Sequence, residues 1–229
     1  MDWTSGALWG ALLAIIVANI LLSGDNAVVI AMAARSLPPE HQKKAVWWGS
    51  AAAIVMRVIL TLVAIKLLSI PYLKIIGGIL LFYIGVQLLT SGDEHADIKG
   101  HGTIGAAIRT ILVADLVMSL DNVIAVASAA DQAPEAAKIP LLIIGLALSI
   151  PLIIGGSTLL IKVMDKYPII ITLGAALLGY LAGSMIVTDP ACAAWFKTNV
   201  PSAEMLAGGL GAILVVVVAK WISKRKATA

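Results

Sequence analysis

Two stretches decide the fold of this chain: Asn19-Ile20-Leu21-Leu22-Ser23-Gly24-Asp25-Asn26 and, 96 residues later, Asp115-Leu116-Val117-Met118-Ser119-Leu120-Asp121-Asn122. Both copies of this motif lie inside long apolar runs. The first copy begins with Asn19, whereas the second begins with Asp115. A carboxylate in a membrane-length segment costs roughly 2.5–3.5 kcal/mol on insertion scales. Because no structural need explains that cost twice at matching positions, the doubled motif predicts a polar site near the middle of a membrane.

The composition places the chain among polytopic membrane proteins. It has 229 residues, of which 60% are hydrophobic and 13% are charged, whereas soluble domains carry roughly 25% charged residues. A hydrocarbon core of ~30 Å is crossed by about 20 apolar residues in a helix. The chain supplies runs of that length repeatedly, which a soluble protein with buried helices would not need.

The apolar runs predict seven membrane-spanning helices. Their expected bounds are about 6–34, 45–68, 71–91, 103–130, 138–162, 167–188 and 204–222. Proline marks several of the breaks: Pro38 and Pro39 follow the first span, and Pro71 and Pro168 lie in the first turns of the third and sixth. Pro151 predicts a kink within the fifth span.

The two halves of the chain correspond beyond the motif. The same offset relates Gly49 to Gly145 and Lys66 to Lys162, and after a one-residue slip Gly77 corresponds to Gly174 and Tyr83 to Tyr180. Repeat one covers about 6–91, a polar linker about 92–102 and repeat two about 103–188. Because three spans is an odd number, consecutive repeats lie in opposite orientations, as in many secondary transporters.

We therefore predict an all-α fold with seven transmembrane helices, arranged as two inverted three-helix repeats plus a seventh helix at about 204–222. All of it forms a single transmembrane domain, residues 1–229. Ala175, Gly179 and Gly183 are spaced by four residues and give the sixth span a small-residue face. Such a face either allows close helix contact or reflects how common small residues are in membrane helices.

The basic residues predict the orientation in the membrane. The net charge is +3 and the pI about 9.0, but Lys and Arg gather at helix ends, which argues against nucleic acid as a partner. One side of the predicted topology carries eleven Lys and Arg residues and the other side four. The positive-inside rule then places the N-terminus outside and the C-terminus in the cytoplasm, in a bacterial inner membrane. Cys192 is the single cysteine, so no disulfide forms within the chain.

The side chains of the motif are hard oxygen donors. Asp25 and Asp121 supply carboxylates, while Asn26 and Asn122 supply amide oxygens. Such donors suit Mg²⁺, Ca²⁺ or Mn²⁺ better than Cu or Zn. Six residues along an ideal helix amount to a rotation of about −120°. For the first residue of each motif to join the Asp-Asn pair, the helix must therefore break or unwind, and Gly24 favours this. The predicted metal-site residues are Asn19, Asp25, Asn26, Asp115, Asp121 and Asn122.

Three other features leave alternatives open. Arg57, within the second span, is either a counter-ion to a carboxylate when the cation is absent, or a residue that snorkels or caps a cavity. Asp115 has Asn19 as its repeat partner, and this asymmetry makes it the favoured proton-coupling residue. The linker at 93–101 contains side chains that can bind metals. We expect a solvated loop there, and the alternative is a weak cytoplasmic site that captures cations.

With Leu-Leu-Ser-Gly-Asp-Asn-Ala-Val-Val-Ile-Ala at 21–31 and Ser-Leu-Asp-Asn-Val-Ile-Ala-Val-Ala at 119–127, the chain resembles the TerC family of integral membrane proteins. The resemblance extends over about residues 5–225. It implies Mn²⁺ export, within a superfamily that also contains lysine exporters. By similarity, Asp25, Asn26, Asp121 and Asn122 would be cation ligands, with Asn19 and Asp115 taking part.

We therefore expect an exporter of a divalent cation, with Mn²⁺ favoured, that works by alternating access coupled to protons. The chain lacks the glycine-rich phosphate-binding motif with its lysine, so we expect no ATP drive. We expect neither enzymatic activity nor a prosthetic group; the partners are the lipid bilayer and the metal, and a homo-oligomer remains open. The alternatives are export of a small organic cation or amino acid, a membrane metal-handling partner of the secretion machinery, and, least favoured, an aspartyl hydrolase using Asp25 and Asp121.

The first prediction concerns this orientation. A reporter fused to the C-terminus is expected in the cytoplasm, because the side with eleven Lys and Arg residues is retained there. Single cysteines placed in the 91–102 linker of a Cys192→Ala background should be labelled from the same side. Labelling of the linker from outside would contradict both the orientation and the inverted repeats.

Overall fold

The computed structural model describes residues 6–68, 70–90, 103–130 and 137–228, which are all helical or connecting, with no β-strand among them. The all-α fold class is thus confirmed. The predicted linker at 92–102 lies outside the described residues. The helices are α1 (Gly6–Leu21), α2 (Gly24–Arg35), α3 (Pro39–Leu68), α4 (Leu73–Thr90), α5 (Ile104–Ala130), α6 (Lys138–Leu148), α7 (Ile150–Lys166), α8 (Ile169–Val187), α9 (Ala193–Asn199) and α10 (Ala203–Thr228).

Within the described residues, five helices are long and apolar enough to cross a membrane, or six if α1 and α2 form one bent span. α3, α4, α8 and α10 each supply one, and α6 with α7 forms a further span of 29 residues. The seven spans expected from the sequence are not reached by this criterion. α5 is not among the five, although its 27 residues extend for about 40 Å.

Prolines set two of the helix boundaries. α3 begins at Pro39, whose missing N–H is tolerated in the first turn. α6 ends at Leu148 and α7 begins at Ile150, with Pro151 in its first turn. Because Pro151 cannot donate to the preceding turn, the fifth span is interrupted at Ser149, which agrees with the expected kink.

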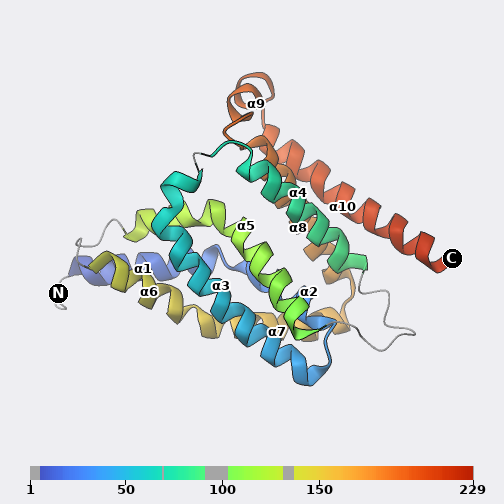
Figure 1. The fold of residues 1–229 in the computed structure, drawn as a ribbon, viewed down its shortest axis with the longest axis horizontal. Helices are drawn as coiled ribbons and strands as arrows, with labels where there is room; N and C mark the ends of the chain where they lie inside the picture. Colours follow the sequence, from blue (N-terminus) through green and yellow to red (C-terminus); the bar gives the residue numbers. More distant parts are fainter. Residues whose placement is uncertain (1–5, 69, 91–102, 131–136, 229) are drawn as a thin grey trace.

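The helices form two groups. α4, α8 and α10 lie side by side, while α1, α2, α3, α5, α6 and α7 form the other group, and the start of α1 and the end of α10 lie at opposite ends of the molecule (Figure 1). Large apolar side chains cover the outside, as a lipid-facing surface requires. Examples that are about three-fifths exposed are Leu13, Val55, Ile79, Leu159 and Ile213. The protein is therefore associated with a lipid bilayer.

Small residues allow α8 and α10 to approach closely. A Cβ atom on Gly179 would clash with the carbonyl oxygen of Gly211, and one on Gly183 would clash with the carbonyl oxygen of Ala207. These are backbone atoms, so they cannot move aside cheaply. The small-residue face of the sixth span thus serves close helix contact, the first of the two interpretations.

The two halves make the same contact twice. α3 packs along α5, and the α6–α7 span packs along α1 and α2. A Cβ atom on Gly49 would lie 2.8 Å from Ile111 Cδ1, and one on Gly145 would lie 2.5 Å from Ile15 Cγ2. The offset of 96 residues converts Gly49 into Gly145 and Ile15 into Ile111. The glycine of each half therefore accommodates the isoleucine of the other.

Asp189 joins the end of the sixth span to the start of the third. Its buried carboxylate accepts hydrogen bonds from the N–H groups of Tyr72 at 2.9 Å, Lys74 at 3.0 Å, Ile75 at 3.3 Å and Ala191 at 2.8 Å. Burial alone would raise the pKa of this carboxyl, but the four backbone N–H groups outweigh it, so the pKa lies below its ordinary value. Asp189 therefore caps α4, a role that the sequence analysis did not assign.

The second prediction concerns this cap. We expect Asp189→Asn to lower the free energy of unfolding at pH 7 by about 1.5–3 kcal/mol, the range for hydrogen bonds to a charged group. Because the folded-state pKa is lowered, the stabilisation is present above the unfolded pKa of about 3.9 and is lost as pH falls through the folded pKa. Thermal unfolding in detergent should therefore show a difference between wild type and variant at pH 7 that shrinks below about pH 4. A difference independent of pH would contradict the charged cap.

Candidate functional site

The first motif copy lies at a break between two helices. α1 ends at Leu21, α2 begins at Gly24, and the two are bent by 46°. The break expected at Gly24 is thus present. In the second copy α5 runs unbroken from Ile104 to Ala130, so positions 115 and 121 stay about 120° apart around the helix. Unwinding of the second copy, which convergence of all six residues would need, is not found.

A buried arginine holds the first residues of both copies together. Arg57, on α3, is 2% exposed. Its Nη1 donates to Asn19 Oδ1 at 2.8 Å and to Ser23 Oγ at 3.2 Å, and its Nε donates to Ser119 Oγ at 3.1 Å. Its Nη2 forms an ion pair with the Asp115 carboxylate. Three helices and the α1–α2 break thus meet at one guanidinium.

The four side chains around Arg57 are two repeat-related pairs. The offset of 96 residues relates Asn19 to Asp115 and Ser23 to Ser119. Within each copy the serine donates to the residue four positions earlier, at 3.3 Å in both cases. All four are at most 5% exposed. We call these residues, Asn19, Ser23, Asp115 and Ser119, the oxygen cage.

Ser149 supports the oxygen cage from the interruption of the fifth span. Asn19 Nδ2 donates to Ser149 Oγ at 2.6 Å, and Ser149 Oγ donates to the Gly145 carbonyl at 3.2 Å. This fixes the Asn19 amide so that its oxygen faces Arg57. Ser149 was not predicted as a site residue from the sequence. Its position two residues before Pro151, at a predicted kink, was the available signal.

Asn26 and Asn122, the asparagines of the two Asp-Asn pairs, meet at the helix break. Asn26 Nδ2 donates to the Leu22 carbonyl at 3.1 Å, and Asn122 Nδ2 donates to the same carbonyl at 3.0 Å. The Asn26 side chain is 3% exposed, and among the described residues its Oδ1 atom is buried without a hydrogen-bond partner. Side-chain amide groups of both motif copies therefore contact the backbone at the break, and the Asn26 oxygen has no hydrogen-bond partner among the described residues.

Asp25 and Asp121 are the aspartates of the two Asp-Asn pairs. Asp25 is half-buried in the first turn of α2, and its Oδ1 accepts from the Asn26 N–H at 2.7 Å. Asp121 lies in α5, but its side chain is outside the described part of the structure. The structure thus brings together Asn19 with Asp115 and Asn26 with Asn122, and places Asp25 next to the second pair.

The oxygen donors of the motif are of the type that binds hard cations. Carboxylate, amide and backbone carbonyl oxygens are what Mn²⁺, Mg²⁺ or Ca²⁺ accept. Among the described residues, no three His, Cys, Asp or Glu side chains lie together. The partnerless oxygen of Asn26 is a buried acceptor that a cation would satisfy.

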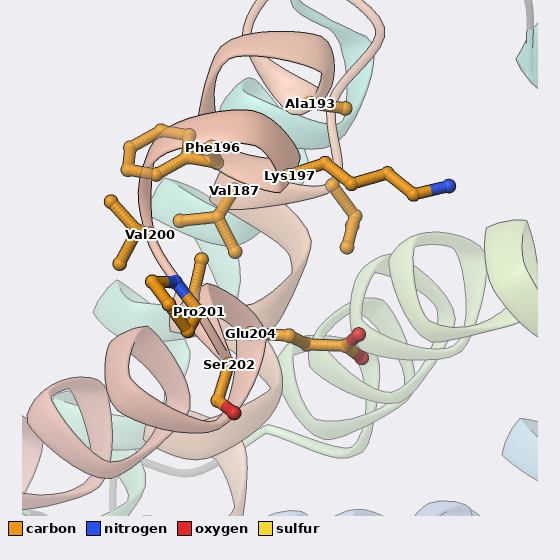
Figure 2. A pocket seen from close by; sticks show the side chains of 10 residues that line it. Val187, Ala193, Phe196, Lys197, Val200, Pro201, Ser202 and Glu204 are labelled. Atoms are coloured by element: carbon orange, nitrogen blue, oxygen red, sulfur yellow. The ribbon is translucent and has the colours of Figure 1, made fainter.

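A separate open pocket of about 370 Å³ lies at the far end of α8. In Figure 2 the Lys197 side chain extends away from the apolar side chains of Phe196 and Val200. Glu204 accepts a hydrogen bond from Ser184 at 2.9 Å. The pocket contains no residue of the doubled motif. Its lining residues are Val187, Thr188, Ala193, Phe196, Lys197, Val200, Pro201, Ser202, Ala203 and Glu204.

The third prediction concerns the buried ion pair. Arg57→Met or Asp115→Leu alone should lower the free energy of unfolding by about 3–5 kcal/mol, because each leaves an uncompensated buried charge. The double variant should cost clearly less than the sum, since no charge is left behind. Unfolding in detergent measures all three, with the exposed Arg109→Met as the matched control, expected within about 0.5 kcal/mol of wild type. Additive single effects would show that the two charges do not depend on each other.

Comparisons with known proteins identify relatives of this chain. The family model described as integral membrane protein TerC family matches residues 4–227. The membrane protein YjbE of Bacillus subtilis is 46% identical over 179 residues, covering 78% of this chain and 80% of the relative. The membrane protein YceF of the same organism is 24% identical over 233 aligned positions, covering 97% and 86%. No solved structure matches the chain. The chain belongs to the integral membrane protein TerC family.

Proposed function

We propose that this protein is a membrane transporter that exports a divalent metal cation, with Mn²⁺ favoured, by alternating access coupled to protons. The observation that carries the proposal is the meeting of two copies of one polar motif inside an apolar helical bundle. Ionisable groups within membrane helices are costly and rare, and they mark functional sites such as ion pathways and proton relays.

The architecture in this proposal has seven spans. They are the five apolar helices, the bent α1–α2 pair and α5. The exchanged contacts of Gly49 with Ile111 and Gly145 with Ile15 support two related three-span repeats, with α10 outside both. In our proposal the repeats are inverted, and the whole chain is one transmembrane domain. The excess of Lys and Arg on one side supports an outside N-terminus and a cytoplasmic C-terminus in a bacterial inner membrane.

In this proposal the cation binds at the helix break. Asp25, Asn26, Asp121 and Asn122 form the ligand set, and the buried partnerless Oδ1 of Asn26 supports it. Discontinuous helices at the centre of inverted-repeat transporters expose backbone carbonyls that coordinate cations, and the Leu22 carbonyl lies at such a break. Asn19 and Asp115 take part when the oxygen cage opens.

The fixed charges fit a divalent substrate. Arg57 and Asp115 cancel each other, which leaves the carboxylates of Asp25 and Asp121 to balance one cation of charge +2. Export then needs an ion gradient, and the proposed exchanged ion is H⁺. Asp115 is the proposed coupling residue, because its repeat partner Asn19 does not carry a charge. The proposal includes neither a catalytic role nor a prosthetic group.

The structure weighs against export of an amino acid. Such a substrate would need a cationic partner for its own carboxylate, and Arg57 was the residue considered for it. Arg57 is buried and already ion-paired with Asp115. A role as a metal-handling partner of the secretion machinery stays a separate alternative, and the transport experiment below distinguishes it.

The fourth prediction tests the site. Asp25→Asn and Asp121→Asn each remove one charge with almost no change in volume, so each alone should abolish Mn²⁺ transport while the protein stays in the membrane. Uptake into proteoliposomes with Mn²⁺, Ca²⁺, Mg²⁺ and Zn²⁺ in parallel measures activity and selectivity. Asp165→Asn, which changes an exposed carboxylate at the end of α7, is the matched control and should transport normally.

Two results would count against the proposal. Near-normal transport by either site variant would show that its aspartate is structural. No transport of any of the four metals by the wild-type protein would favour the metal-handling alternative.

A further inference from the structure

We propose that Arg57 is a tethered counter-cation that fills the oxygen cage when no metal is bound and competes with the transported cation for it. This inference rests on the proposed transport function and adds a regulatory role for one residue. The Arg57 guanidinium donates to four side-chain oxygens, and all five residues are buried.

The oxygen cage has the composition of a hard-cation site. It offers one carboxylate, one amide oxygen and two hydroxyls, and the arginine is bonded to an oxygen of each. These are donor types that a divalent cation accepts from a protein. The guanidinium therefore occupies the position that a metal ion would take among these atoms.

Arg57 has no counterpart in the second repeat, unlike the residues of the oxygen cage. The four cage residues form two pairs related by the offset of 96 residues, whereas the position related to Arg57 is Ile153. A residue whose only role was to hold the two equivalent halves together could come from either half or from both. A single cation reaching in from α3 instead fills a space that the two motif copies form together.

Two opposite effects follow for transport. A divalent cation that approaches the oxygen cage is repelled by Arg57 and must displace it from Asp115, so the pairing lowers the apparent affinity for metal. After the metal leaves, the same pairing keeps Asp115 from being a lone buried charge until the exchanged proton reaches it. Arg57 thus weakens metal binding and stabilises the metal-free site during the transport cycle.

A purely structural role of Arg57 predicts a different outcome. If Arg57 only joined α3, α5 and the α1–α2 break, its removal would loosen the site and weaken metal binding. Loss of packing would also impair every mode of transport equally. The direction of the affinity change and the comparison of two transport modes therefore separate the roles.

The experiment uses the full-length protein and Mn²⁺ alone as the probe. Mn²⁺ affinity is measured on purified protein in detergent, and two fluxes are measured in proteoliposomes. Net efflux requires the empty transporter to return, whereas exchange of labelled for unlabelled Mn²⁺ does not. The variant is Arg57→Gln. Its matched control is Arg109→Gln, an exposed arginine on α5 that lies outside the oxygen cage.

We expect Arg57→Gln to bind Mn²⁺ at least about tenfold more tightly, because the internal competitor is gone. Net efflux should fall at least about tenfold while exchange stays within about threefold of wild type. Arg109→Gln should match wild type in all three measurements. Arg57→Lys keeps the charge but loses the planar fork, so it should shift all three values less, in the same directions.

Weaker or unchanged Mn²⁺ binding by Arg57→Gln overturns the inference, as does full net efflux or an equal loss of both fluxes. If Arg57→Gln does not reach the membrane, Arg57→Lys decides, and an absence of shift in that variant is equally negative. Failure of the proposed function is a different result. In that case wild-type protein shows neither flux.

Discussion

A guanidinium buried within a membrane must have every charge and donor satisfied by protein, since lipid offers no partners. Arg57 meets that condition through four side chains from two segments that are distant from it and from each other in sequence. Its burial therefore fixes how α3, α5 and the α1–α2 break lie relative to one another. Through Asn19 and Ser149 the constraint extends to the interruption between α6 and α7.

The two copies of the motif differ in backbone, and one of their five sequence differences accounts for it. Gly24 in the first copy corresponds to Leu120 in the second. Glycine is about 1 kcal/mol less favourable than alanine in a helix, whereas leucine is among the good helix formers. The first copy breaks and the second continues as α5. A single broken copy is enough to present the Leu22 carbonyl to asparagines from both halves.

Apolar length and proline positions were sufficient to predict the helical class, and Gly24 predicted the break between α1 and α2. Most helix ends lie within a few residues of the expected bounds, but α3 begins at Pro39 instead of about 45 and α10 ends at Thr228 instead of about 222. The partners of Arg57 were not predictable in the same way, because a long side chain can reach several neighbouring helices. Ser149 and Asp189 were missed for a related reason. Each is one common polar residue whose role appears only when distant backbone segments meet, as Asp189 does with the start of α4.

Asn19 and Asp115 are the one repeat-related pair in the oxygen cage whose members differ. The charge of the single arginine bound there explains the difference. With aspartate at both position 19 and position 115, a single guanidinium would leave one negative charge unbalanced. With asparagine at both, Arg57 itself would be a lone buried cation, which costs several kcal/mol. Asn19, Asp115 and Arg57 together are neutral and leave the hydrogen-bonding geometry of the repeat intact. The asymmetry between the two motif copies thus has an electrostatic reason that lies in a third helix.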